Sequence, residues 1–270
     1  GSDWQVIMAK RGYQENFYNL YEKFQDTDNR RGKADKTIQM LLQHSGVSLD
    51  DRTCLDLGCS NGIFTSALAP LFKHMVGVDY DRTAIHLIPM EDRQKILFIW
   101  GDAMQLPFAD ETFEAVICAQ VYEHVPDDLT LFSEMERILK PGGVVFFSGP
   151  NKLFPVEPHY YLPFLHWLPE KAADAYLRLL RKGDHFYERS RTPGNLRRVL
   201  QHFDIRDVSI PVVRLYAGKQ KPGWKKTAYN LFSHLPLWLW KPLIPLLPNF
   251  NWILFKRPDP ESRQQYEIVP

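Results

Sequence analysis

The stretch from Leu55 to Gly62 constrains the fold of this chain more than any other; it reads Leu-Asp-Leu-Gly-Cys-Ser-Asn-Gly. It lies between a strand-like run that begins at Thr53 and a run with helical spacing that begins at Ile63. Glycines at 58 and 62 permit the tight turn in which a strand passes into a helix beneath a bound nucleotide. Such turns also serve dinucleotide-binding proteins, so this stretch alone does not identify the ligand.

Strand-like and helix-like runs alternate along the first 150 residues. This alternation predicts parallel strands joined by right-handed helical crossovers, which is a doubly wound α/β sheet. Two further strands are predicted at 203–213 and 251–255. The other predicted strands are 53–57, 75–79, 96–100, 115–119 and 144–148, and the predicted helices are 36–43, 63–71, 83–90 and 129–139.

Three more motifs follow the first turn in order: Val-Gly-Val-Asp at 76–79, Gly-Asp-Ala at 101–103 and Lys-Pro-Gly-Gly at 140–143. The series resembles the class I S-adenosylmethionine-dependent methyltransferases, especially the small-molecule, methyltransferase-11-type branch that includes the quinone-biosynthesis enzymes. The resemblance covers roughly residues 33–150 and is weak elsewhere. It implies a mostly parallel seven-stranded sheet of the Rossmann-like methyltransferase fold, closed by an antiparallel last pair and carrying helical cap insertions.

The resemblance also implies S-adenosylmethionine as cofactor and S-adenosylhomocysteine as product. Asp56 would receive the amino group of the methionine end, Asp79 the two ribose hydroxyls and Asp102 the adenine amino group. A nicotinamide dinucleotide is disfavoured, because Ser60 and Ile63 stand where its motif has glycine. The expected cofactor-binding residues are Tyr18, Tyr21, Asp56, Gly58, Cys59, Gly62, Asp79, Tyr80, Asp102, Ala103, Met104, Gln120 and Val121.

Two histidines are candidate general bases. His124 follows the fourth predicted strand and can take a proton near neutral pH, although a loop histidine bonded to backbone is the alternative. His159 lies in the segment after the fifth strand, where acceptors bind in this fold and two prolines stiffen the path. No metal is expected. The expected acceptor-binding residues are Asn151, Glu157, His159, Tyr160 and Tyr161.

Additions on both sides of the 33–150 core are predicted. Aromatic residues at 13, 17, 21 and 24 recur at helical spacing and predict an N-terminal helix, within 3–32, that covers the cofactor. The later divisions are a cap insertion at 151–192, the C-terminal part of the sheet at 193–258 with an insertion at 219–249, and a tail at 259–270.

The net charge of +1 hides an asymmetry between the two halves. Residues 1–150 hold 14 basic and 22 acidic side chains, and residues 151–270 hold 19 and 10, so the balances are −8 and +9. The basic half favours an anionic partner, and two solvated faces are the alternative. Nucleic acid is disfavoured, because no Asn-Pro-Pro-Tyr-like tetrapeptide follows the fourth strand.

The 219–249 segment combines lysines with leucine and tryptophan, the composition of a chain lying in a membrane interface. A lid over the acceptor pocket and a homodimer interface are the alternatives. No signal peptide follows the tag-like Gly1-Ser2, and no apolar run reaches the ~20 residues of a spanning helix. We therefore expect a cytoplasmic protein. If the 219–249 segment contacts a membrane, the protein would be peripheral at an anionic surface. The three cysteines have neither CxxC nor metal-ligand spacing, which favours a reduced cytoplasmic compartment.

The sequence thus predicts an enzyme that methylates oxygen or carbon of a small hydrophobic or amphipathic acceptor, such as a lipid-linked, quinone-like or glycan intermediate. The alternative is a catalytically silent subunit of the same fold that binds a membrane or a partner enzyme.

Overall fold

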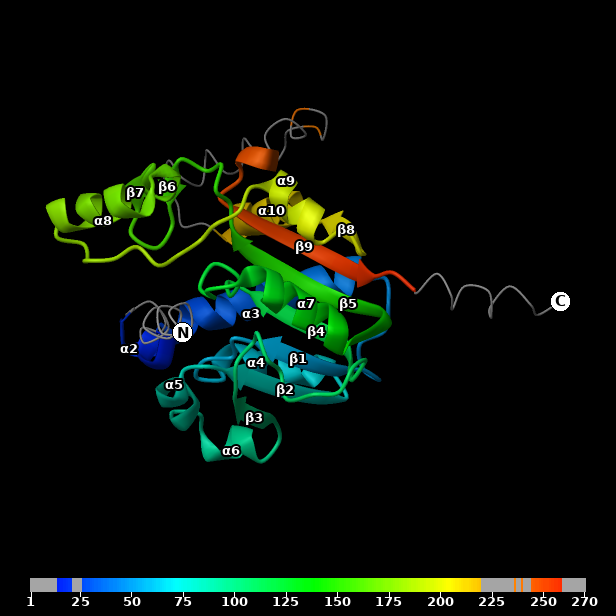
Figure 1. The fold of residues 1–270 in the computed structure, drawn as a ribbon. Coiled ribbons are helices and arrows are strands. Elements are labelled where there is room, and N and C mark those ends of the chain that lie inside the picture. Colours follow the sequence, from blue (N-terminus) through cyan, green and yellow to red (C-terminus); the bar gives the residue numbers. More distant parts are fainter. Residues whose placement is uncertain (1–13, 21–25, 220–235, 237–238, 240–243, 259–270) are drawn as a thin grey trace.

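A computed structural model describes residues 14–20, 26–219, 236, 239 and 244–258. A seven-stranded sheet forms its centre (Figure 1). The strands are β1 (Thr53–Leu57), β2 (His74–Asp79), β3 (Leu97–Trp100), β4 (Phe113–Ala119), β5 (Leu139–Pro150), β8 (Phe203–Asp207) and β9 (Asn249–Lys256). Their order is β3-β2-β1-β4-β5-β9-β8, with β1 to β5 parallel and β9 antiparallel to both of its neighbours. The doubly wound sheet and its antiparallel closure are confirmed.

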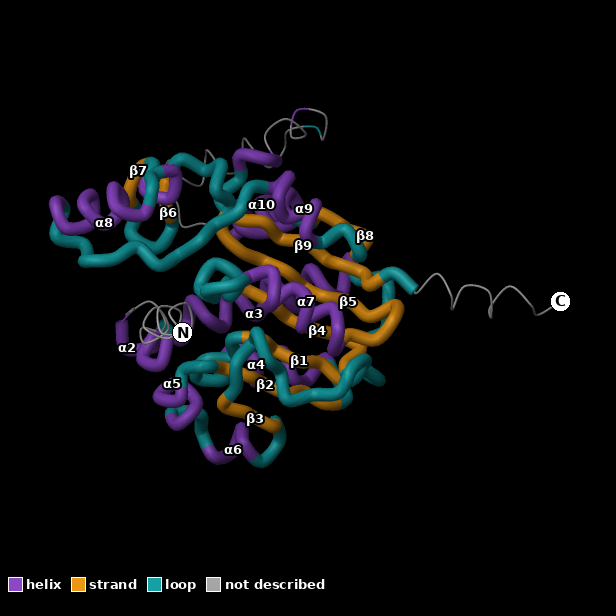
Figure 2. The backbone as a smooth tube through the Cα atoms, viewed as in Figure 1, coloured by secondary structure: helices purple, strands orange, loops and turns teal. Residues whose placement is uncertain are grey.

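Helices cover both faces of the sheet (Figure 2). One face carries α3 (Thr27–His44), α4 (Ile63–Leu68) and α10 (Ser209–Lys219), and the other carries α7 (Asp128–Ile138) and α9 (Pro193–Val199). Side chains alternate along a strand, so Phe146 of β5 packs in the core under α3 while Phe147 packs in the core under α7. The short helices α5 (Arg82–His86) and α6 (Met90–Arg93) connect β2 to β3.

The prediction of one long strand at 203–213 is wrong beyond Asp207. The β-branched residues that follow belong to α10, whose Ile210 and Val212 are buried. Pro211 lies in the first turn of this helix, where its missing N–H costs no intrahelical hydrogen bond. The helix predicted at 36–43 begins earlier, because the Asp26 side chain caps it by accepting a hydrogen bond from the Asn29 N–H (3.0 Å).

Residues 151–191 form a separate cap that projects beyond the carboxyl end of β5 (Figure 1). It contains a small antiparallel pair, β6 (Val156–Glu157) and β7 (Leu162–Pro163), followed by the short 3-10 helix η4 (Leu165–Trp167) and the α-helix α8 (Glu170–Leu179). Its own small core comprises Leu162, Leu165, Ala173 and Leu177. Tyr21 and most of the 219–249 insertion lie outside the described residues. Within the ranges described, no helix combines the length and apolarity needed to cross a bilayer.

Candidate active site

A cavity of about 590 Å³ lies at the carboxyl ends of the parallel strands. Asp56, Asp79 and Asp102, which come from the ends of β1 and β2 and from just beyond β3, all line it. Parallel strands end at the same edge of a sheet, and open α/β sheets bind ligands there. The gathering of these three carboxylates at one rim, which the sequence predicts, is therefore present.

Asp56 is buried and holds one hydrogen bond, accepted from the Thr65 hydroxyl at 2.6 Å. Burial raises the pKa of Asp56 to about 7; the Thr65 bond opposes this rise and the nearby charge of Asp79 adds to it. Such a carboxyl ionises more readily when a cation approaches it. It therefore suits the amino group of the expected cofactor.

Asp79 accepts hydrogen bonds from the backbone N–H groups of Ser60 and Asp81, both at 2.7 Å. Burial raises the pKa of Asp79 to about 6, although these two bonds lower it. Asp102 accepts from the Met104 N–H at 3.0 Å. Each carboxylate oxygen has more than one lone pair, so all three side chains can also accept from ligand hydroxyl or amino groups.

The turn after β1 requires glycine at position 58. Gly58 has φ +78°, and a Cβ at this position would lie 2.7 Å from Cγ2 of Val121. The absence of a side chain thus lets the β1 turn approach the loop after β4. Ser60 and Gln120, which also line the cavity, have φ of +51° and +61°, a region that costs energy for residues other than glycine and is frequent at functional sites.

The N-terminal segment covers one side of the cavity with η1 (Gln14–Asn16) and α2 (Phe17–Leu20). The Gln14 side chain donates to the His124 carbonyl, and the Phe17 ring meets the His124 ring edge to face at 4.6 Å between centroids. Tyr18 is not among the lining residues, but its N–H donates to the lining residue Asp81 at 2.7 Å. These contacts place Gln14 and Phe17 over the loop that follows β4, and Tyr18 beside the loop that follows β2.

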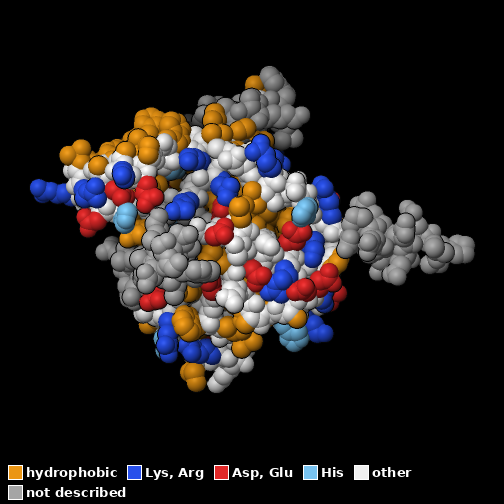
Figure 3. Space-filling model, in the orientation of Figure 1, with side chains coloured by type: hydrophobic (Ala, Val, Ile, Leu, Met, Phe, Trp, Pro, Cys, Tyr) orange, Lys and Arg blue, Asp and Glu red, His pale blue; other side chains and the backbone are white. Residues whose placement is uncertain are grey.

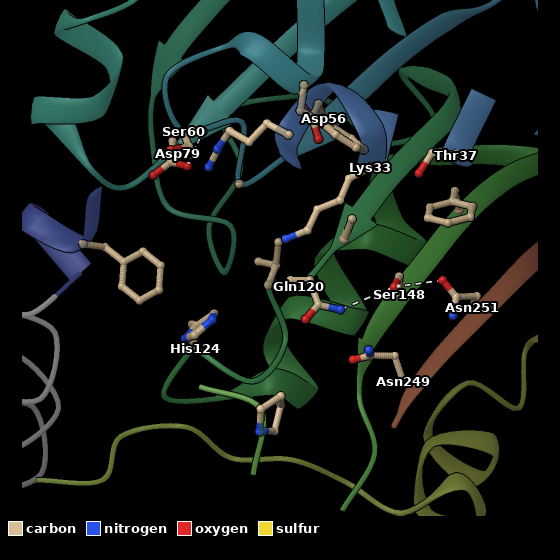
Figure 4. A pocket seen from close by; sticks show the side chains of 18 of the residues that line it. Lys33, Thr37, Asp56, Ser60, Asp79, Gln120, His124, Ser148, Asn249 and Asn251 are labelled. Carbon is tan, nitrogen blue, oxygen red and sulfur yellow. Dashed lines mark hydrogen bonds between the residues drawn. The ribbon is translucent and has the colours of Figure 1, made fainter. Parts of the chain in front are cut away.

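His124, one of the two candidate bases, lines the cavity (Figure 4), and its ring centroid lies 4.9 Å from that of His159, the other candidate. The ring of His159 is held by Glu157, whose Oε1 lies 2.6 Å from Nδ1. Burial alone would lower the pKa of His159, but the bond to Glu157 and the charges of Glu188 and Glu123 outweigh it and raise the pKa. Burial raises the pKa of Glu123 to about 7. The side chains of Glu123, His124 and His159 approach closely enough to hold a cation together.

The structure brings most of the expected site residues to this cavity. Those that line it are Asp56, Gly58, Asp79, Tyr80, Asp102, Ala103, Gln120, Val121, His124, His159 and Tyr161.

Other expected residues have structural surroundings instead. The Asn151 amide donates to the carbonyls of Pro245 (2.7 Å) and Leu247 (2.8 Å), and Tyr160 packs on Phe186. Glu157 is fully buried and contacts the His159 ring without lining the cavity itself. Cys59, Gly62 and Met104 support the walls: Cys59 packs with Ile85 and Ile88, Gly62 begins α4 with φ +76°, and Met104 packs against the main core.

Sequence reasoning missed a second group of lining residues. Lys33 and Lys36 come from α3, Ser148 from β5 and Asn251 from β9. Two patterns in the sequence mark these lining residues. Arg30, Lys33 and Lys36 are spaced by three, which places them on one helix face, and the two polar residues stand where strand alternation would place apolar side chains.

Comparisons with known proteins agree with this geometry. The family model "Methyltransferase domain" matches residues 55–147. A ubiquinone biosynthesis O-methyltransferase of Histophilus somni is 28% identical over 166 residues, which cover 57% of this chain and 65% of that protein. A demethylmenaquinone methyltransferase of Bacillus licheniformis is 30% identical over 168 residues, which cover 58% of this chain and 70% of that protein. The chain thus spans just under two thirds of the first relative.

Solved structures share the fold. The PH0226 protein of Pyrococcus horikoshii OT3 has a TM-score of 0.57 at 17% identity, covering 90% of this chain and 99% of that one. An S-adenosylmethionine-dependent methyltransferase of Mesorhizobium loti has a TM-score of 0.51 at 14% identity, covering 79% and 95%. At these identities the likeness concerns the fold alone.

Proposed function

This chain belongs to the class I S-adenosylmethionine-dependent methyltransferases, and on that premise we propose that it methylates oxygen or carbon of a small hydrophobic or amphipathic acceptor. The observation that carries the proposal is a single cavity with two kinds of wall. Cofactor-type carboxylates, Asp56, Asp79 and Asp102, line one part, and a histidine pair lines another.

The residues present fit the cofactor. Bound S-adenosylmethionine supplies an electrophilic methyl group on a sulfonium sulfur. Asp56 would hold its amino group, Asp79 its ribose hydroxyls and Asp102 its adenine amino group, while Gly58 leaves room for backbone contact with the methionine end. The protein's remaining tasks are to align the acceptor and to exclude water.

A hydroxyl acceptor would have to lose its proton when it takes the methyl group that the bound cofactor would supply. His124 and His159 line the same cavity, and their imidazoles are placed to take that proton. Glu157 orients His159 and stabilises the imidazolium form. The imidazole would then pass this proton to water.

Calorimetric titration with S-adenosylhomocysteine tests the proposal. Micromolar binding that weakens ~10-fold or more in Asp79→Asn is expected, because charge-assisted hydrogen bonds to the ribose would be lost. Absence of heat with the wild-type protein would instead favour the silent subunit. Turnover is then measured as S-adenosylhomocysteine release from S-adenosylmethionine in the presence of a bacterial lipid extract.

The base assignment has its own test. We expect His124→Ala to lower the methylation rate by ~10²-fold while leaving affinity for S-adenosylhomocysteine nearly unchanged, because a general base acts on the acceptor's proton and not on the cofactor. His86→Ala, an exposed histidine on α5, is the matched control. An unchanged rate in His124→Ala would remove this residue from the mechanism.

We further propose that the acceptor reaches the enzyme at an anionic membrane surface. The described cap supports this: large apolar side chains gather on it (Figure 3), and Leu179, Phe164 and Trp167 are about half to four-fifths exposed, at 78%, 50% and 47%. Exposed cations at Arg178 and Lys182 flank Leu179. An apolar surface edged by cations is the complement of an anionic lipid interface. The 219–249 segment, most of which lies outside the described residues, has the same composition.

A further inference from the structure

The cavity has an arm that neither the cofactor carboxylates nor the histidine pair accounts for. It extends under α3, between β5, β9 and the start of α10, and Figure 4 shows Thr37, Ser148, Asn249 and Asn251 on the side of the cavity opposite Asp79. Lys36 also lines this arm. Resting on the proposed function, we propose that this arm binds an acidic group of the methyl acceptor, a carboxylate or a phosphate, through the ammonium of Lys36.

The first argument is the charge of Lys36. Its ammonium lies in the cavity wall, donates to Oδ1 of Asn251 at 3.2 Å and lies 5.9 Å from the centre of the Phe146 ring. No carboxylate of the described chain forms an ion pair with it. Among the described residues, the charge that lowers the pKa of Lys36 is another cation, Lys33, on the same helix face. Charges withdrawn from water are normally paired in proteins, so this half-buried cation favours an anion from outside the described residues, which a bound ligand can supply.

The second argument is the hydrogen-bonding capacity around that cation. An ammonium has three donors, and Asn251 takes one, which leaves two for a ligand. Asn251 Oδ1 also accepts from the Ser148 hydroxyl (3.3 Å), and that hydroxyl accepts from the Gln120 amide (3.4 Å). The network fixes Asn251 with its oxygen toward Lys36. It also links the arm to Gln120, at the end of β4.

The third argument is the pattern along the strands. On the face under α3, β5 reads Val144, Phe146, Ser148 and β9 reads Ile253, Asn251, and the register pairs Ser148 with Asn251. The apolar core thus changes to a matched polar pair where the cavity begins. In addition, Oδ1 of Asn249 is buried without a hydrogen-bond donor among the described groups. A polar, cationic recess built into the end of an apolar core indicates a ligand site, because such groups cost stability when they bind nothing.

A direct test measures the binding of three probes to protein saturated with S-adenosylhomocysteine. Benzoate and the neutral benzamide have the same shape and differ in charge, and phenyl phosphate is the phosphate probe. We expect at least one anion to bind about tenfold or more tightly than benzamide. The better of benzoate and phenyl phosphate identifies which acidic group the arm takes. Lys36→Met should erase the preference for the anion and Lys36→Arg should retain it. Lys95→Met, at an exposed lysine outside the cavity, should leave it unchanged.

Three outcomes overturn the inference. Equal binding of benzamide and both anions at millimolar concentration, including no binding of any probe, shows that the arm does not select charge. An anion preference that survives in Lys36→Met assigns it to another group. Weaker S-adenosylhomocysteine binding in Lys36→Met would show that this lysine binds the cofactor's own carboxylate. Failure of the wild-type protein to bind S-adenosylhomocysteine is a separate result, since it sinks the proposed function itself.

Discussion

At the scale of single residues, the cavity is lined by ionisable groups of both signs. Buried Asp56 and half-buried Asp79 lie where the amino and adenosyl groups of the cofactor would bind, and Lys36 lies in the arm under α3. Burial raises the pKa of both carboxyls and lowers the pKa of the lysine, which means that each group is held partly toward its neutral form until a ligand of opposite charge or a hydrogen-bond donor arrives. Two predictions follow from these directions.

Cofactor binding should release protons at pH 7. With a pKa of about 7, Asp56 is close to half protonated in the free protein, and the positive amino group of S-adenosylhomocysteine would drive it to the carboxylate. Calorimetry in two buffers of different ionisation enthalpy measures the release. Asp56→Asn should abolish most of it and weaken binding by roughly 10–100-fold, since a charge-assisted hydrogen bond is lost. Equal heats in both buffers for the wild-type protein would contradict the role of Asp56.

Lys36→Met should stabilise the protein at pH 7. Burial lowers the pKa of Lys36 from 10.5 to about 8, and Lys33 adds to this; the facing groups from β5, β9 and α10, which are Ser148, Asn251 and Ser209, are not titratable. Below pH 8 Lys36 is charged in both states, and this charge is less favourable in the folded protein than in the unfolded chain. At about 1.4 kcal/mol per pKa unit, the pKa shift corresponds to a loss of folding stability of up to about 3 kcal/mol.

The sign of the pH dependence follows from proton counts. Between pH 8 and 10.5 the unfolded chain binds the proton and the folded protein does not, so the lysine's contribution makes the wild-type free energy of unfolding rise with pH. Urea unfolding at pH 7 and 9.5 should show that rise diminished in Lys36→Met, relative to the Lys95→Met control. A loss of stability at pH 7 in Lys36→Met would mean that the lysine supports the fold.

At the scale of elements, one buried tyrosine joins the cap to the sheet. The Tyr122 hydroxyl donates to the Pro150 carbonyl, where β5 leads into the cap, and accepts from the Arg191 N–H (3.1 Å), where the cap returns. The Arg191 side chain also pairs with Asp128 of α7. The loop after β4, which contains His124, is thereby fixed to both stems of the cap that holds His159.

Tyr122→Phe should loosen the cap. Removing the hydroxyl takes a hydrogen-bond partner from the buried Pro150 carbonyl and from the half-buried Arg191 N–H, which costs about 1–3 kcal/mol. Chemical denaturation should show this loss, and amide hydrogen exchange across 151–191 should accelerate. Tyr176→Phe is the matched control, because Tyr176 packs in the cap core and its hydroxyl holds no described hydrogen bond. Equal exchange in the two variants would show that other contacts hold the stems.

At the scale of the whole molecule, exposed leucines occur in two settings. Leu179 and Leu180 lie on the apolar cap surface, whereas Leu97 lies on β3, at the edge of the sheet. Flotation with anionic vesicles should carry the protein upward and should weaken as salt rises, since screening acts on exposed charges. Replacing Leu179 and Leu180 with serine should reduce flotation, and Leu97→Ser, on β3, should not. Retention of the protein in the soluble fraction at every ionic strength would remove the membrane from the proposal.

The sequence by itself determined the sheet and the cofactor rim, because both follow from local order. Strand, helix and strand in succession dictate parallel strands, and parallel strands bring Asp56, Asp79 and Asp102 to one edge without further information. The sequence failed at α10, where the β-branched Val212 and Val213 suggested a strand but packing beside α3 favoured a helix.

Only the tertiary structure decided the arm under α3. Lys36 and Asn251, which are hydrogen-bonded there, stand 215 residues apart. Their meeting depends on β9 entering the sheet beside β5 and on α3 crossing that face, two packing outcomes that no local pattern of charge or apolar spacing specifies. Local periodicity shows which face of an element is buried, whereas long-range packing decides which two buried faces share a cavity.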